Sequence, residues 1–506
     1  MSENNNAKKI TTGALVLMIF STIFGFANTP VAFMQMGYGA ILWYILGALL
    51  YFLPSSLMYA EYGSALKESK GGIYSWLDAS ISEKWSFIAT FIWLSAWVIW
   101  QVMVSQKICI TISTIIFGHD TTNTWHLFGL NSTLTVALIS IIGVIAITWL
   151  VNHGIDTIAK ISSIGGLAVM LLNVTLILSS VFILFKNHFQ LAQPIQHVSQ
   201  FATSVNPQFQ SPIAMISFMI YAIFAYGGLE SMGGVTDSLD KPEKTFPRAI
   251  IISTVVIGIG YALNIFLWGI STNWNHVINH PDVNLGNITY VLMQNLGLEL
   301  GKAFHLSTHA ALTMGTVFSR LSAIGMLCAY LGSFFVLIYS PLKSFIMGSP
   351  KELWPEKVTK LNKKGMPSFA LWVQTAIVCV IIGGVAIAST LIHQDSKFLF
   401  NLLTSMSNVA STLPYLFLVA AFPFFKKRQD LDRPFEAFHS RKTMLVIVTI
   451  TLITLAIANG FTIIQPFIEK DWVGAAATVA GPLVFGIFAW ALYTTRSKRI
   501  KNNVNN

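Results

Sequence analysis

The sequence is poor in charged residues, and this scarcity is its most informative property. Only 10% of the 506 residues are Asp, Glu, Lys or Arg, whereas 54% are hydrophobic. A soluble globular protein contains about 25% charged residues. The composition therefore excludes a soluble domain as the main body of the chain and predicts an integral membrane protein.

Two kinds of reactive site are also missing from the sequence. The three cysteines, Cys109, Cys328 and Cys379, all lie in apolar runs, so they read as small core residues. No glycine-rich phosphate loop is present, so energy would have to come from solute or ion gradients. No cofactor is predicted. A membrane-embedded enzyme is disfavoured, because only Glu230 of the catalytic residue types is well placed within a span.

The chain does contain long apolar runs. Each is about 20 residues long, enough to cross the hydrocarbon core of a bilayer. The runs are continuous rather than alternating, which favours helices over a barrel. We predict twelve transmembrane spans, at residues 12–35, 40–63, 86–117, 132–151, 160–184, 213–236, 249–271, 321–345, 368–391, 399–424, 443–465 and 474–494.

The distribution of basic residues explains the net charge of +10. Most of the Lys and Arg residues fall in segments that share one side of the predicted membrane, including the loop 351–364 and the tail 496–501. Because basic loops stay in the cytoplasm, both termini are predicted to be cytoplasmic. This pattern describes topology, so the predicted partners are the lipid bilayer and a small solute rather than nucleic acid.

Two spans carry helix-breaking residues near mid-membrane. The first contains "GFANTP", from Gly25 to Pro30, and the sixth contains "FAYGGLES", from Phe224 to Ser231. Small residues also serve helix packing, which is the alternative explanation for either break alone. Paired breaks at corresponding positions in two halves favour an inverted-repeat transporter. Unwound backbone exposes N–H and C=O groups that bind a carboxylate and an ammonium, so a zwitterionic solute is predicted.

Glu230 and Lys107 are charged residues placed deep within predicted spans, where a functional role is the default expectation. Glu230 follows the second break by one turn and is a candidate proton-sensing or coupling residue; a purely structural carboxylate is the alternative. Lys107 is a candidate partner for a substrate carboxylate or for Glu230, or it snorkels to the outer face. A polar run from Thr404 through Ser405 to Thr412 in the tenth span is a further candidate contact surface.

Several motifs resemble the amino acid–polyamine–organocation (APC) superfamily. They are "FAYGGLES...DKPEKTFPRAI", "EYGSALKESKGGIYSWL", "TLPYLF" and "GSPKELWPEKVTKLNKKGMPSFAL"; the segment "LWYILGALLYFLPSSLMYAEYG" is most similar to the bacterial glutamate/GABA antiporter branch. The resemblance implies an all-α fold of twelve transmembrane helices in one membrane transport domain over residues 1–506. It implies two inverted five-helix repeats (12–184 and 213–424), two additional helices (443–494), and discontinuous helices 1 and 6.

The resemblance also implies where a substrate would bind. The backbone amides of Ser21, Thr22 and Ile23, next to Gly25, would face the substrate carboxylate. The amino group would lie at Phe224, Ala225, Tyr226 and Gly227, with Phe224 as an aromatic gate. Glu230 matches an acidic residue that some acid-resistance antiporters use in proton sensing.

The sequence departs from the superfamily pattern at three points, and each bears on coupling. Phe20-Ser21-Thr22 replaces the usual Gly-Ser-Gly of helix 1, a change shared with the glutamate/GABA branch. Helix 5 lacks the mid-span lysine of proton-coupled members, and helix 8 offers only Ser333 where a sodium site would need paired hydroxyls. Neither coupling ion is therefore specified.

The functional prediction is a secondary active transporter that moves amino acids, glutamate/GABA-like or neutral, across the bacterial plasma membrane by alternating access. Antiport is the leading mode. A proton-coupled symporter, a transporter-like sensor and a membrane-embedded enzyme are the alternatives. Whether the chain works alone or as a homodimer is left open.

Overall fold

The computed structural model describes residues 9–69, 71–391 and 396–504. Within these ranges the regular secondary structure is helical, apart from a single isolated bridge between Ile10 and Leu239. Eleven helical segments are long and apolar enough to cross a membrane. The first predicted span is helical as well, but it is divided into two short helices. The predicted all-α fold with twelve spans is therefore confirmed.

The first six spans contain both interruptions. They are formed by α1 (Thr12–Thr22) with α2 (Asn28–Met36), α3 (Gly39–Gly47) with the π-helical turn η1 (Ala48–Phe52) and α4 (Leu53–Ala65), α6 (Glu83–Phe117), α7 (Ser132–Val151), α8 (Ile155–Lys186), and α9 (Pro212–Ala225) with the 3₁₀ segment η5 (Leu229–Ser238).

The last six spans are single helices. They are α10 (Pro242–Ser271), α12 (Thr308–Gly348), α14 (Ser368–Leu391), α15 (Ser396–Phe425), α16 (Arg441–Ile468) and α17 (Trp472–Val504). Short helices lie in the connections between spans: α5 (Ile73–Asp78), η2 (Thr122–Thr124), η3 (Val198–Phe201), η4 (Pro207–Phe209), η6 (Trp274–Ile278), α11 (Ile288–Ala303), η7 (Lys351–Leu353) and α13 (Glu356–Thr359).

The structure differs from the predicted boundaries mainly between the seventh and eighth spans. Residues 308–320, predicted to be a loop, extend α12 at its N-terminal end, and α11 was not predicted. The prediction relied on apolar length, which detects the membrane-crossing core of a helix but not an amphipathic extension or a short helix beside it. α11 buries one face, including Leu292 and Leu296, and packs against α12 and α8.

Several helices begin at a side-chain cap. Thr11 accepts a hydrogen bond from the amide of Ala14, Asn131 from Leu134 and Ser211 from Ala214, at N···O distances of 3.3, 2.9 and 3.1 Å. Each cap satisfies one of the four amides that lack a partner in the first turn. These polar caps place the helix starts at the ends of the apolar runs.

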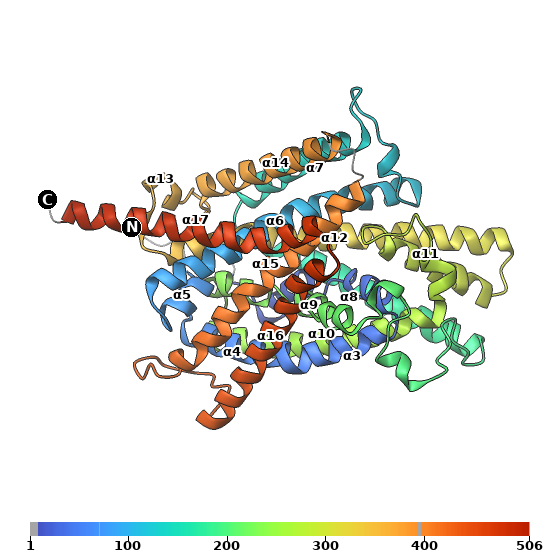
Figure 1. Ribbon diagram of the computed structural model, residues 1–506, viewed down its shortest axis with the longest axis horizontal. Helices are drawn as coiled ribbons and strands as arrows, with labels where there is room; N and C mark the ends of the chain where they lie inside the picture. The colour runs from blue at the N-terminus through green and yellow to red at the C-terminus, as the bar shows by residue number, and fades with distance from the viewer. Residues whose placement is uncertain (1–8, 70, 392–395, 505–506) are drawn as a thin grey trace.

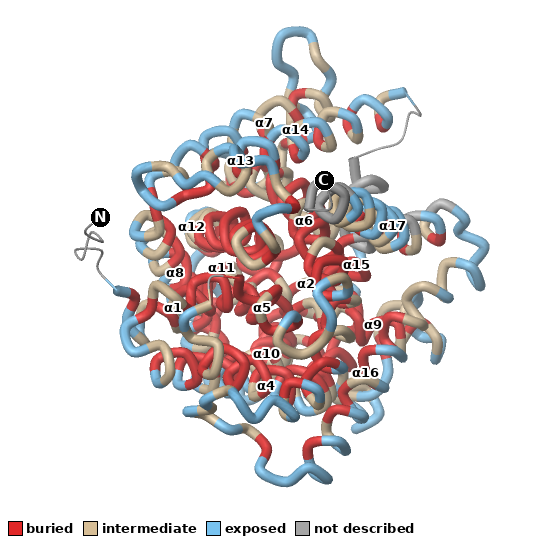
Figure 2. Tube along the Cα trace, turned by 90° about the vertical axis from the view of Figure 1, so that its left-hand side faces the viewer, coloured by how far each residue is buried: buried red, intermediate tan, exposed pale blue. Residues whose placement is uncertain are grey.

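The buried residues lie along the middle of the bundle, and the exposed ones cover its outside (Figure 2). Many exposed side chains on the long helices are large and apolar, for example Ile142, Leu171, Ile259 and Val380. An apolar exterior of this extent is the surface expected against lipid tails.

Glycines allow α1, α8 and α12 to approach closely. A Cβ atom on Gly166 of α8 would lie 2.0 Å from the carbonyl oxygen of Leu17 in α1, and one on Gly165 would lie 2.6 Å from that of Cys328 in α12. Small residues at such contacts are typical of packed membrane helices. α1, which leads into the interruption of the first span, is therefore packed tightly against α8 and α12.

Figure 1 marks both chain termini on the same side of the molecule, as an even number of crossings requires. We refer to this side as the terminal end and to the other side, which carries α11 and the 118–131 connection, as the opposite end. The boundaries of the two five-helix repeats stay a prediction.

Candidate functional site

The first span is interrupted between Thr22 and Asn28. The amide of Ile23 still donates to the carbonyl oxygen of Ile19 (2.8 Å), so the amides of Ser21, Thr22 and Ile23 are used within or at the end of α1. No hydrogen bond joins the amides of Phe24, Phe26 or Ala27 to another described residue. Unpaired amides therefore occur about one turn later than the resemblance implied, between the end of α1 and the start of α2.

The sixth span is interrupted at the glycine pair. α9 ends at Ala225, and Gly228 adopts φ = +106°, a conformation that side chains other than glycine's rarely tolerate. The chain continues as the 3₁₀ segment η5 rather than as an α-helix. The glycine pair thus supplies the local conformation that separates the two half-helices.

The two breaks lie beside each other. A Cβ atom on Gly228 would be 3.3 Å from the Thr22 side chain. Tyr261 on α10 joins them, because its hydroxyl lies 2.5 Å from the carbonyl oxygen of Ile23 and 3.0 Å from that of Ala225. Tyr261 was not predicted from the sequence, since nothing distinguishes it there from other aromatic residues of its span.

A cavity of about 80 Å³ lies between the two breaks. Seven of its lining residues come from the predicted substrate set: Ser21, Thr22, Ile23, Gly25, Phe224, Ala225 and Gly227. The structure therefore brings together in space segments separated by about 200 residues of sequence. This cavity is the candidate substrate site.

Two further helices complete the cavity wall. α6 contributes Trp97, Trp100, Met103, Val104 and Lys107, and α12 contributes Met326, Ala329, Tyr330 and Ser333. The indole nitrogen of Trp97 is buried and has no hydrogen-bond partner in the described structure. A buried donor of this kind on a cavity wall is suited to bind an acceptor group of a solute.

A second cavity of about 40 Å³ lies next to the first, towards the opposite end. Asn28, Met103, Lys107 and Phe224 line both cavities. Phe224 therefore lies between the two cavities, and its role as an aromatic gate stays a prediction. Asn408, from the polar run of α15, lines the second cavity, whereas the side chains of Thr404 and Ser405 lie outside the described residues.

Lys107 is the only cationic side chain among the described residues that line the two cavities, and no Asp or Glu is found among them. It lies on α6 and is partly buried. It therefore places a basic side chain within reach of a solute in either cavity.

Two predicted site residues do not line either cavity. Tyr226 is buried against α3 and η1: its hydroxyl donates to the carbonyl oxygen of Tyr44 (3.0 Å), and its ring stacks on Phe52. Glu230 lies behind the break. The sequence could not separate these orientations, because neighbouring residues at a break point in different directions.

Glu230 is buried and accepts three hydrogen bonds. The indole nitrogen of Trp93 and the hydroxyl of Tyr415 donate to Oε1 at 2.8 and 3.3 Å, and the amide of Gly228 donates to Oε2 at 3.1 Å. Both carboxylate oxygens therefore face donors. This arrangement ties the second break to α6 and α15.

These features define the class of protein. A helical bundle in which two interrupted spans meet at a small central cavity is the architecture of a secondary transporter. The same fold occurs in a crystal structure of a manganese transporter from Eremococcus coleocola, with a TM-score of 0.55 and 15% identity, covering 97% of this chain and 94% of that one. Among the described residues, no group of three or more His, Cys, Asp or Glu side chains is placed to hold a metal ion.

The chain belongs to the amino acid permease family, whose profile matches residues 10–490. It is 47% identical to the inner membrane transporter YjeM of Escherichia coli over 503 residues, 98% of each chain. The aspartate/glutamate permease AcaP of Lactococcus lactis is 25% identical, covering 91% of this chain and 87% of the permease. A glutamate/gamma-aminobutyrate antiporter of Lactococcus lactis is 23% identical, covering 91% and 85%.

The predicted resemblance to the APC superfamily is thereby confirmed. The relatives are named as transporters and permeases, so the chain is a membrane transporter of small molecules and not an enzyme. Its multi-pass character follows from its apolar helices.

Proposed function

We propose that this protein exchanges acidic amino acids, glutamate or a close analogue, for a related amino acid across the bacterial plasma membrane, with both termini in the cytoplasm. The observation that carries this proposal is the central cavity, which combines one cation with a carboxylate-free lining among the described residues. The ammonium group of Lys107 attracts a second substrate carboxylate and offers no comparable interaction to a neutral side chain.

The proposed binding mode uses the ends of the half-helices. The α-carboxylate would accept hydrogen bonds from the amides at the start of α2, where the helix dipole is positive. The ammonium group would lie near the carbonyl end of α9, at Ala225, where the dipole is negative. The side-chain carboxylate would then reach Lys107 and the indole N–H of Trp97.

A further observation supports the proposal. The relatives named as aspartate/glutamate permease and glutamate/gamma-aminobutyrate antiporter align over most of the chain.

The test is transport by purified protein in proteoliposomes. We expect uptake of labelled glutamate only when the vesicles contain an exchangeable amino acid. Uptake into empty vesicles driven by a proton gradient would instead establish the proton symport alternative. Failure to move any amino acid would refute the transport proposal. If the protein also failed to bind glutamate, the alternative of a transporter-like sensor for glutamate would be refuted as well.

Lys107→Gln tests the substrate class. Hydrogen bonds to charged groups contribute about 1.5–3 kcal/mol, so the KM for glutamate should rise at least about tenfold. The KM for a neutral amino acid, where one is transported, should change little. Lys302→Gln, on the exposed side of α11, is the matched control. An unchanged KM for glutamate in Lys107→Gln would exclude this lysine from substrate binding.

A further inference from the structure

A cavity of about 540 Å³ lies at the terminal end, between the last turn of α15 and the first turns of α16. It is separate from the transport site, because no residue lines both this cavity and either central cavity. Its lining is strongly basic: Lys426, Lys427, Arg433 and Arg441 accompany a single carboxylate, Glu436.

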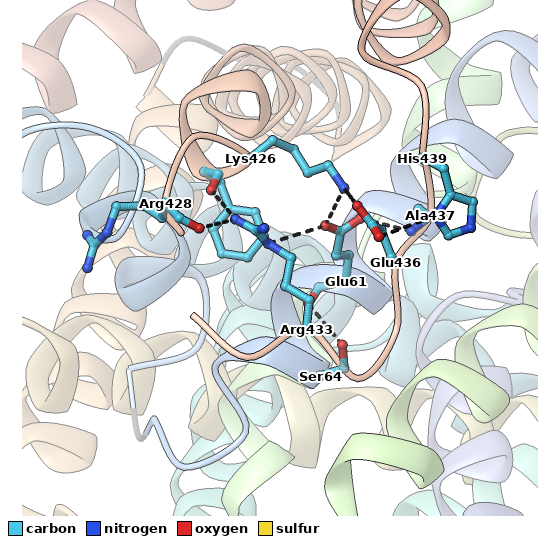
Figure 3. Close-up of polar contacts among 9 residues, drawn as sticks. Glu61, Ser64, Lys426, Arg428, Arg433, Glu436, Ala437 and His439 are labelled. Carbon is cyan, nitrogen blue, oxygen red and sulfur yellow. Dashed lines mark hydrogen bonds and ion pairs between the residues drawn. The ribbon is translucent and has the colours of Figure 1, made fainter. Parts of the chain in front are cut away.

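The connection between α15 and α16, residues 426–440, is anchored on Glu61, a fully buried residue of α4 (Figure 3). Lys426 Nζ lies 3.0 Å from Glu61 Oε1 and 2.6 Å from Glu436 Oε1. The amide of Ala437 donates to Glu61 Oε2 at 2.9 Å. The bond from Lys426 lowers the pKa of Glu436, which is therefore ionised at neutral pH. These contacts hold the cavity in a defined shape.

Arg433 strengthens the same anchored connection through one of its nitrogens, and another of its nitrogens lacks a hydrogen-bond partner. One of its terminal nitrogens donates to the carbonyl oxygen of Phe425 at 2.9 Å, capping α15. Its Nε lies 3.7 Å from Glu61 Oε1, too far for a hydrogen bond, and this buried nitrogen has no hydrogen-bond partner in the described structure.

Two cations of the cavity are not used by these anchors. Lys427 and Arg441 are exposed and take part in none of the ion pairs formed by the described residues. They come from opposite sides of the cavity, one after the end of α15 and the other at the start of α16. The cavity thus retains two positive charges after Lys426 and Arg433 are matched with Glu61 and Glu436.

Part of the remaining wall is apolar and belongs to membrane-spanning helices, while Phe438 and His439 of the connection between α15 and α16 complete the lining. Phe424 in the last turn of α15 and Leu445 in α16 are 52% and 41% exposed, respectively. An exposed apolar wall beside a cluster of cations suits an amphiphile whose charged head and apolar chains lie at a membrane boundary. A free phosphate ion would use the cations but not this wall.

We propose that this cavity binds the phosphate headgroup of an anionic phospholipid in the leaflet at the terminal end. Lys427 and Arg441 contact the phosphate, and the acyl chains pass over Phe424 and Leu445. The bound lipid joins α15 to α16 and, through Lys426 and Arg433, to Glu61 on α4. It therefore stabilises the assembled bundle without entering the transport path.

The experiment titrates purified full-length protein in neutral detergent micelles with phosphatidylglycerol, phosphatidylcholine or soluble glycerol 3-phosphate, and follows thermal unfolding. We expect phosphatidylglycerol to raise the unfolding temperature in a saturable manner, whereas the other two compounds leave it unchanged. Equal stabilisation by phosphatidylcholine would overturn the charge recognition. Equal stabilisation by glycerol 3-phosphate would identify a free-anion site and overturn the lipid proposal.

The double variant Lys427→Gln/Arg441→Gln should bind phosphatidylglycerol about 30-fold more weakly, because each basic residue at an anionic lipid surface contributes about a fivefold change. Both side chains are exposed, so the variant should fold normally. Lys357→Gln/Lys363→Gln removes the same charge from exposed positions in the connection between α12 and α14 and should retain the affinity of the unmodified protein. Equal affinities of the two double variants would refute the site.

Discussion

Both carboxylate oxygens of Glu230 accept hydrogen bonds. In Glu230→Gln, one oxygen becomes an NH₂ group that must face Trp93 and Tyr415 or the amide of Gly228. A buried donor left without an acceptor costs about 1–3 kcal/mol, so we expect a loss of stability of this size in denaturant unfolding. Glu299→Gln, in a surface ion pair with Lys302, should change stability by less than about 1 kcal/mol. An unaltered stability of Glu230→Gln would contradict the hydrogen-bond assignment.

The coupling role of Glu230 is a separate proposal with its own readout. If protonation of this residue regulates exchange, Glu230→Gln should bind glutamate but lose the pH dependence of transport in proteoliposomes. The measurement is the initial exchange rate across external pH 5–8. A variant with the pH profile of the unmodified protein would exclude Glu230 from proton sensing and leave it with the structural role.

The contact between α8 and α1 depends on Gly166. A methyl group at this position would lie 2.0 Å from the backbone oxygen of Leu17, and a helix backbone cannot yield as a flexible side chain can. We expect Gly166→Ala to lower the free energy of unfolding by about 1–3 kcal/mol, as overpacking does elsewhere. Because α1 leads into the first break, exchange activity should fall as well.

Gly143→Ala on α7 is the matched control for this packing. Its Cβ atom would meet nothing within 4 Å, so stability should stay the same or rise slightly. Unfolding measured by thermal denaturation in detergent compares the two variants. If Gly166→Ala is as stable as Gly143→Ala, the close contact between α1 and α8 at Gly166 is refuted.

The breaks themselves could be located from sequence, because their cause is local. Gly25, Pro30 and the pair Gly227-Gly228 disfavour continuous helix wherever they occur. The register at the first break could not be predicted, since α1 continues through Thr22 and moves the unpaired amides to Phe24, Phe26 and Ala27. Where a helix ends depends on packing against α8, α10 and α12 as well as on its own residues.

At the scale of the whole molecule, an ion pair joins two different spans on the terminal side of the central cavities. Lys343 Nζ on α12 lies 2.7 and 2.9 Å from the two carboxylate oxygens of Asp237 on η5. The central cavities, by contrast, extend towards the opposite end. If the protein works by the proposed alternating access, we expect this pair to separate when the site opens to the terminal side.

Asp237→Asn should therefore favour the state open at the terminal end. The measurement is the labelling rate of Ala329→Cys, a cavity position, by a membrane-impermeant maleimide applied from the terminal side, with the three native cysteines replaced. We expect an increase of about tenfold, which corresponds to a shift of about 1.4 kcal/mol. Asp430→Asn, which removes an ion pair within one exposed loop, should leave the rate unchanged. Equal rates in both variants would show that the pair does not control access.

The amino-acid sequence by itself determined the membrane class, the twelve spans, the two breaks and the family. These properties depend on composition, apolar length and breaker residues, which act over a few turns of one helix. The sequence also singled out Lys107 and Glu230, because charges within apolar spans are rare enough to stand out.

Only the tertiary structure decided which way the side chains point. Most spans are apolar on all sides, so their periodicity does not reveal which face meets the cavity. Packing between helices far apart in sequence therefore directs Trp97 and Tyr330 into the cavity, places Glu230 behind the break, and lets Tyr261 join the two breaks. The same long-range packing brings Lys426 and Arg433 to Glu61, a contact that spans more than 360 residues of sequence.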